Sequence, residues 1–271
     1  MGSIPAGEIE LGGRSLAWRT VGGGPPLLLI NGYAATGEDW DPSFLEALGK
    51  SFEMICPDNR GVGGSGLGDL ELSVDGMAAD MESLLDALEI ERAPVVGWSM
   101  GGFVAQRLTA RAPERVAALA LLATDPGGPD SVSADPEIWA QLVDHTGSDR
   151  EQASRLISLL FPPSLAADID RQFGAIVAAA RASLSPQVLR MQEAAMDAWH
   201  QDGSFPSDDG VPPPTLVIHG ELDQVIPPAN AEPLAARWPG AQIEVFPGCG
   251  HALMAQQPQR IADLIRTLAL D

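Results

Sequence analysis

Three side chains in this sequence have the types and the order needed for nucleophilic catalysis, and the first is a serine. Ser99 lies in the sequence Gly-Trp-Ser-Met-Gly-Gly at residues 97–102, between an apolar run and a stretch with helical spacing. In a strand–turn–helix setting, Gly-x-Ser-x-Gly presents a serine hydroxyl at a sharp turn, and the glycines leave room for that turn. We expect Ser99 to be a nucleophile; the alternative is a glycine-rich turn that carries an idle serine.

A serine hydroxyl needs a base to remove its proton and an acid to orient that base. Of the four histidines, His251 is the candidate base, because it lies in a glycine-rich loop that follows a short strand. Asp223 is the candidate acid, since it comes just beyond a buried strand over residues 215–219, and Glu221 is the nearest alternative. Isolated loop residues of these types are usually surface residues, but the order Ser99, Asp223, His251 favours catalysis.

The order nucleophile, acid, base resembles that of the α/β-hydrolase family. The resemblance rests on four separate segments, which are residues 58–65, 97–102, 220–227 and 250–251. It covers roughly residues 10–125 and 212–270. It implies an α/β-hydrolase fold and a serine-dependent hydrolytic activity that uses no metal and no cofactor.

The resemblance also implies two backbone donors for an oxyanion. One is the N–H of Met100, and the other is the N–H of Tyr33 in the loop over residues 31–37. Many relatives have His-Gly where this chain has Asn31-Gly32, but Asn31 can still hydrogen-bond the loop backbone, so we expect the oxyanion hole to form. The Tyr33 ring could line the pocket, its hydroxyl could contact the substrate, or the side chain could simply pack in the loop.

Alternating strands and helices are expected to position these residues. Strands are expected over residues 14–21, 27–30, 52–56, 93–96, 116–122, 216–219 and 243–246, and helices over residues 44–48, 74–88, 103–110, 230–238 and 258–268. This alternation predicts a mostly parallel, doubly wound α/β sheet with helices on both faces. Ligands bind at the carboxyl ends of such strands. Because Ser99, Asp223 and His251 all follow strand ends, the topology should bring them to one edge.

Residues 126–211 break this alternation. They show helical patterns over residues 137–143, 151–160, 165–180 and 186–199 and no good strand. The resemblance implies a helical cap inserted after the sixth strand, on a core domain of residues 1–125 and 212–271; a peripheral helical decoration is the alternative. A cap would shield the cleft from water and supply side chains that set specificity.

Candidates for substrate contact come from both the core and the cap. They are Gly32, Trp98, Trp139, Phe161 and Trp199. Apolar cap residues divide between cap core and pocket lining, and most residues of this kind are core. His145 and His200 also lie in the cap, and we expect them to be exposed to solvent.

The composition is typical of a globular protein with one α/β domain and an insertion, at 271 residues with 45% hydrophobic and 20% charged residues. The 37 acidic and 16 basic residues give a net charge of −21, which disfavours nucleic acid, anionic membranes and polyanionic substrates. The N-terminus does not have the pattern of a signal peptide, and no apolar run approaches the roughly 18 residues that span a membrane. We therefore expect a cytoplasmic protein. The two cysteines, Cys56 and Cys249, indicate neither a disulfide framework nor a metal site.

These features predict a serine hydrolase that forms an acyl-enzyme and cleaves a carboxylic ester or lactone of a neutral, moderately hydrophobic small molecule. A serine at position 99 argues against the dehalogenases and epoxide hydrolases of the family, which place aspartate there. Carbon–carbon bond hydrolysis and perhydrolysis use the same triad and remain alternatives, as does a small-molecule receptor with slow turnover. The sequence predicts no oligomeric state.

Overall fold

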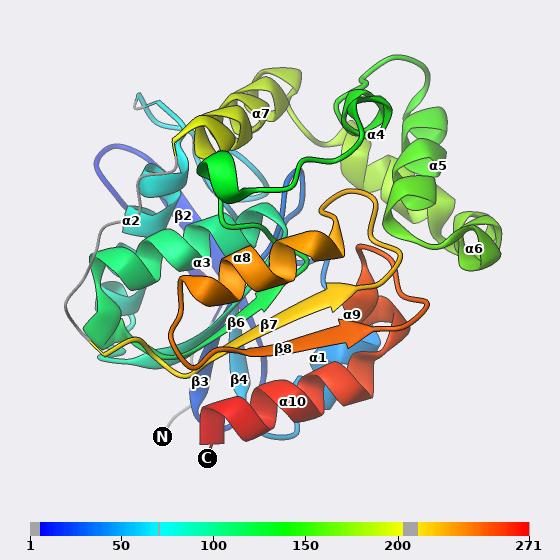
Figure 1. The fold of residues 1–271 in the computed structure, drawn as a ribbon. Helices are drawn as coiled ribbons and strands as arrows, with labels where there is room; N and C mark the ends of the chain where they lie inside the picture. Colours follow the sequence, from blue (N-terminus) through cyan, green and yellow to red (C-terminus); the bar gives the residue numbers. More distant parts are fainter. Residues whose placement is uncertain (1–5, 70, 203–210, 271) are drawn as a thin grey trace.

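A computed structural model describes residues 6–69, 71–202 and 211–270, and these residues form an eight-stranded sheet (Figure 1). The strands are β1 (Gly7–Glu10), β2 (Ser15–Gly22), β3 (Pro26–Ile30), β4 (Glu53–Pro57), β5 (Ala93–Trp98), β6 (Val116–Leu122), β7 (Thr215–Gly220) and β8 (Gln242–Phe246). Their order is β1-β2-β4-β3-β5-β6-β7-β8. Strand β2 pairs antiparallel with β1 and β4, and every other pairing is parallel.

Helices cover both faces of the sheet, and each face has its own apolar core (Figure 1). The helices outside the insertion are α1 (Pro42–Leu48), α2 (Val74–Ala87), α3 (Met100–Arg111), α8 (Ala231–Ala236), α9 (Leu253–Gln256) and α10 (Pro258–Leu270), with short 3-10 turns at Pro113–Arg115, Gly128–Asp130 and Pro228–Asn230. Helices α2, α3 and α8 pack in one core, and α1, α9 and α10 pack in the other. The predicted doubly wound α/β fold is confirmed.

Strand β3 shows why continuous apolar runs become the central strands. Successive side chains of a strand point to opposite faces of the sheet. Leu28 and Ile30 therefore pack in one core, whereas Leu27 and Leu29 pack in the other. Neither face of such a strand contacts solvent, so its sequence does not alternate between apolar and polar residues.

A helical insertion follows β6, as predicted. It comprises α4 (Pro136–Leu142), α5 (Asp149–Leu160), α6 (Pro163–Ala182) and α7 (Pro186–Gln201). Helix α5 begins with a capping box in which the Ser148 and Glu151 side chains bond each other's backbone N–H groups. In Figure 1 the insertion lies above the sheet, with α7 next to α2.

One strand and one α-helix were not predicted. Strand β1 has four residues, two of them glutamates, and lies at the end of the sheet, so its sequence carries little apolar signal. Helix α9 has a single turn of four residues. Among the described residues, no helix is long and apolar enough to cross a membrane.

Candidate active site

Ser99 occupies the sharp turn between β5 and α3 in a strained backbone conformation, with φ 55° and ψ −126°. Such a conformation costs on the order of 1–3 kcal/mol for a non-glycine residue and persists only where the surroundings impose it. Here the Ser99 carbonyl accepts hydrogen bonds from the Thr124 hydroxyl at 2.9 Å and from the next turn of α3. The neighbouring glycines are required for space, because a Cβ on Gly101 would lie 2.1 Å from the carbonyl oxygen of Ile30.

His251 and Asp223 form a buried hydrogen-bonded pair. The His251 Nδ1 atom lies 2.7 Å from Oδ2 of Asp223, which is 4% exposed. The other carboxylate oxygen, Oδ1, accepts the N–H groups of Val225 and Ile226, each at 2.9 Å. Because an ionised carboxylate can only accept, Nδ1 carries the proton in this pair. The Nε2 atom of a neutral His251 is then free to accept a proton.

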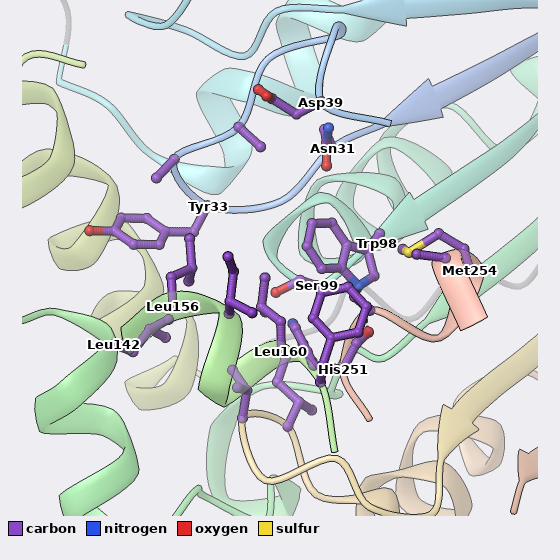
Figure 2. A pocket seen from close by; sticks show the side chains of 18 of the residues that line it. Asn31, Tyr33, Asp39, Trp98, Ser99, Leu142, Leu156, Leu160, His251 and Met254 are labelled. Carbon is purple, nitrogen blue, oxygen red and sulfur yellow. Dashed lines mark hydrogen bonds between the residues drawn. The ribbon is translucent and has the colours of Figure 1, made fainter. Parts of the chain in front are cut away.

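The loop that carries His251 is fixed from two sides. The indole Nε1 of Trp98, the residue before the serine, donates to the His251 carbonyl at 3.0 Å, and the two rings lie 5.2 Å apart. A Cβ on Gly220 would lie 2.4 Å from the Gly250 carbonyl oxygen, so the end of β7 packs directly against this loop. Ser99 and His251 line the same pocket, and Figure 2 shows both side chains there.

Glu221, the alternative acid, lies in a different environment. It is exposed, and its carboxylate accepts the N–H of Gly248 at 2.9 Å. The structure therefore pairs His251 with Asp223 rather than with Glu221.

The loop after β3 lies against the serine and is held by Asn31. Oδ1 of Asn31 accepts the N–H of Gly32 at 2.9 Å, and its Nδ2 donates to the Thr36 carbonyl at 2.8 Å. The Asn31 carbonyl in turn accepts from Asn59 at 2.8 Å. The expected bonding of Asn31 to the loop backbone is thus confirmed. A Cβ on Gly32 would lie 3.1 Å from the Cβ of Ser99, so this loop has no space to move toward the nucleophile.

The two residues proposed as oxyanion donors flank this contact. Met100 is the first residue of α3, so its N–H has no acceptor within the helix. Tyr33 follows Gly32, and its ring lines the pocket. Its hydroxyl donates to Oε1 of Glu193 at 2.5 Å and points away from Ser99 in Figure 2. Burial, together with the Glu193 carboxylate, raises the pKa of Tyr33 above its usual value.

The pocket above Ser99 has a volume of about 980 Å³ and is largely apolar. Trp98, Trp139 and Phe161 line it, as do the residues of the insertion that Figure 2 labels, Leu142, Leu156 and Leu160. The described lining residues do not include Gly32, which packs beside the serine instead.

Trp199, predicted to contact substrate, lies in the core. It is 3% exposed and stacks on Phe103 with ring centroids 5.0 Å apart. Its Nε1 donates to Oδ1 of Asp125 at 3.0 Å. An indole on an amphipathic helix can face either the domain beneath it or the cavity beside it, and here it faces the domain.

The two histidines of the insertion are part-buried and paired, although solvent exposure was expected. His145 Nε2 lies 2.7 Å from Oε1 of Glu193. His200 lines the pocket, and its Nε2 lies 3.0 Å from Oδ2 of Asp125. Burial lowers the pKa of His200, but the hydrogen bond and charge of Asp125, with the charge of Asp197, outweigh burial and raise this pKa above its usual value.

His219 is a titratable residue close to the pair that the sequence did not single out. It is fully buried on β7. Burial lowers the pKa of His219 to about 4 despite the opposing charge of Asp223. Only its place near the end of the strand before Asp223 could have indicated this position from the sequence.

Known proteins resemble this chain in sequence and in fold. The alpha/beta hydrolase fold family matches residues 25–258. The chain is 31% identical over 257 residues to the 2-hydroxymuconate semialdehyde hydrolase of a Pseudomonas species, covering 90% of this chain and 86% of that protein. Its fold is similar to that of a meta-cleavage product hydrolase from Pseudomonas fluorescens, at 25% identity and a TM-score of 0.81 over 97% of this chain and 96% of the other. It is also similar to a thermophilic esterase from Thermogutta terrifontis, at 25% identity and a TM-score of 0.74 over 97% of each chain.

Proposed function

This chain belongs to the α/β-hydrolase fold family, and from that premise we propose that it is a serine hydrolase for carboxylic esters or lactones of neutral, moderately hydrophobic small molecules. One observation carries the proposal. Ser99, in a strained turn, shares an apolar pocket with His251, which is bonded at 2.7 Å to the buried Asp223. A strained serine, a base and an acid that orients the base thus lie together at a pocket that a substrate could occupy.

In the proposed first step, Nε2 of His251 takes the hydroxyl proton as Ser99 attacks the ester carbonyl. Asp223 keeps the proton on Nδ1 and stabilises the imidazolium that forms. The N–H groups of Met100 and Tyr33 donate to the oxyanion. The imidazolium then returns its proton to the leaving alcohol, which leaves an acyl group on Ser99.

In the second step, His251 takes a proton from water as that water attacks the acyl carbonyl. The same two backbone donors hold the second oxyanion. The intermediate breaks down to the free acid, and the proton held by His251 restores the Ser99 hydroxyl. The cycle consumes one water and needs no other reactant.

The pocket supports a neutral and moderately hydrophobic substrate. Most of its exposed surface is apolar, and its lining includes Phe173 and Ile176, two exposed apolar side chains. Glu38, Asp39 and Asp197 are exposed lining residues that repel an approaching anion, while the buried cation Arg181 also lines the pocket. We further propose that residues 126–211 act as a cap over a core of residues 1–125 and 212–271.

Carbon–carbon bond hydrolysis is the second candidate, because two of the similar proteins carry that kind of activity in their names. One of those names is that of a 2-hydroxymuconate semialdehyde hydrolase, and 2-hydroxymuconate semialdehyde carries a carboxylate. The acidic residues Glu38, Asp39 and Asp197 weigh against such a substrate, whereas Arg181 would favour its carboxylate. A perhydrolase, or a receptor with slow turnover, would keep the same serine. A low turnover number would distinguish the receptor from an enzyme.

The test is hydrolysis of p-nitrophenyl acetate, butyrate and octanoate, of a γ-lactone, and of 2-hydroxymuconate semialdehyde by the wild type and Ser99→Ala. We expect turnover of esters or the lactone, with kcat falling by on the order of 10⁴ or more in Ser99→Ala. Turnover of the semialdehyde alone would replace ester cleavage by carbon–carbon bond cleavage. Tight binding without turnover of any substrate would favour the receptor.

A further inference from the structure

Two adjacent residues of the insertion hold the loop that carries Tyr33. Gln192 on α7 accepts the N–H of Ala34 through Oε1 at 2.9 Å, across 158 residues of sequence. Glu193 accepts the Tyr33 hydroxyl at 2.5 Å, across 160 residues. The peptide after the proposed oxyanion donor and the side chain of that donor are thus both bonded to one turn of one helix.

Packing alone does not account for a glutamine at position 192. The side chain is fully buried, and its Nε2 has no hydrogen-bond partner among the described residues. A buried polar group left unpaired costs about 1–3 kcal/mol, which an apolar side chain of similar shape would avoid. The polar contact that Gln192 does make is the bond from the Ala34 N–H. We therefore attribute the presence of an amide at position 192 to its bond with the Ala34 N–H.

Ala34 needs such a restraint, because it adopts a left-handed conformation with φ 57°. For a residue other than glycine this conformation is unfavourable by roughly 1–2 kcal/mol. On the other side of Tyr33, the Gly32 N–H is bonded to Asn31. The N–H of Tyr33 therefore lies between two peptide groups that are each fixed by a side chain.

Glu193 is itself held in place. Its Oε1 accepts the Tyr33 hydroxyl and lies 2.7 Å from Nε2 of His145, on the segment between α4 and α5. A carboxylate with two partners on different segments has little freedom to rotate away from Tyr33. The insertion is thereby connected to the loop by the Tyr33–Glu193–His145 side-chain network and by the bond from the Ala34 N–H to the Gln192 side chain.

We propose that Gln192 and Glu193 are positioning residues for the oxyanion donor of Tyr33, so that α7 of the insertion completes the catalytic site. This inference rests on the proposed function. A misplacement of about 1 Å in a reacting group can cost 100-fold in rate, whereas removal of an oxyanion donor costs about 100- to 1,000-fold in kcat. A donor that is loosened but still present should cost less, on the order of tenfold.

Gln192→Met tests this most directly, since it keeps the length of the side chain and removes the acceptor. We expect kcat for p-nitrophenyl butyrate to fall about tenfold, with KM within about threefold of wild type, because the donor acts in the transition state. Gln192→Glu restores an oxygen acceptor and should recover most of the kcat. Gln187→Met makes the same change at an exposed position of α7 and should leave kcat unaltered.

Tyr33→Phe is the independent variant, because it removes one hydroxyl and keeps the backbone donor. It should lower kcat without a matching rise in KM. The rate at which a fluorophosphonate labels Ser99 is measured in every variant, since that reaction also develops charge on an oxygen and requires no natural substrate. We expect labelling to slow in Gln192→Met and Tyr33→Phe in parallel with kcat.

Unaltered kcat and labelling rate in both Gln192→Met and Tyr33→Phe would overturn the inference, as would an equal loss in Gln187→Met. If Gln192→Met does not fold, Tyr33→Phe decides. A wild-type protein that hydrolyses esters while these variants match it refutes the positioning role alone. A wild-type protein with neither ester turnover nor label on Ser99 refutes the proposed function.

Discussion

A Cβ atom on Gly32 would lie 3.1 Å from the Cβ of Ser99, so the loop after β3 and the turn after β5 are in van der Waals contact. Strands β3 and β5 are neighbours in the sheet although residues 31–92 separate them in the sequence.

 Ile30, the last residue of β3, pairs with Gly97 in the parallel register. Because parallel neighbours end at the same edge, their two loops emerge together and bring the proposed donor of Tyr33 beside the nucleophile.

Gly32→Ala should therefore impair catalysis without unfolding the protein. The added methyl group would press on Ser99 and Trp98 and displace the loop, and we expect kcat to fall by on the order of tenfold or more. Gly23→Ala is the matched control, because a Cβ at Gly23 meets nothing within 4 Å. Steady-state kinetics and thermal unfolding of both variants check this, and a wild-type kcat in Gly32→Ala would contradict it.

Asp223→Asn should lower kcat by about 10⁴ while preserving the fold, because an amide in place of the carboxylate favours the wrong tautomer of His251. Glu221→Gln changes the neighbouring acid in the same way and should leave kcat within about threefold of wild type. The pair of variants is compared with one p-nitrophenyl ester at a pH where the wild type is fully active. A larger loss of kcat in Glu221→Gln than in Asp223→Asn would show that Asp223 is not the acid.

The fold followed from the sequence wherever one physical signal was strong. The apolar run of β3 and the helical spacing of α2 predicted their elements to within a few residues. Strand β1 was missed because its half-buried and exposed residues alternate over only four positions and include Glu8 and Glu10. Such a strand depends on pairing with β2, which is a tertiary contact and leaves no local pattern.

The site was predictable only in its motif-bearing part. Ser99, Asp223 and His251 stand in recognisable turns and in a fixed order, so sequence alone could nominate them. Gln192 and Glu193 are polar residues in an ordinary helix, and only the folded structure brings them to residues 33 and 34. Residues that belong to no motif and contact the site only through the tertiary fold cannot be predicted from a single sequence.

His219 should make the protein less stable as the pH falls from about 6.5 to about 4. Burial lowers its folded-state pKa to about 4, so in this range the unfolded chain binds a proton that the folded protein does not, and stability is lost with acid. The loss in the free energy of unfolding that His219 causes over this pH range is about 3 kcal/mol at most. Urea unfolding of the wild type and His219→Gln across this pH range should show a smaller acid loss in the variant. Parallel losses in the two proteins would contradict the assignment to His219.

Truncation of Trp139 should alter substrate preference, whereas truncation of Trp199 should lower stability. Trp139 lines the pocket, so Trp139→Ala should chiefly alter the ratio of kcat/KM for p-nitrophenyl octanoate and acetate. Trp199 is buried against Phe103, so Trp199→Ala should cost about 3–5 kcal/mol of stability. Denaturant unfolding and the two esters are measured for each variant. A stability loss confined to Trp139→Ala would reverse this placement.

The central claim is that Ser99 is a nucleophile activated by His251, and covalent labelling tests it most directly. The wild type, Ser99→Ala and His251→Gln are treated with a fluorophosphonate, and the adduct is located by peptide mass spectrometry. The account predicts one adduct on Ser99 in the wild type, none in Ser99→Ala, and labelling slowed by at least about 100-fold in His251→Gln. An adduct on another residue, or undiminished labelling in His251→Gln, would contradict it.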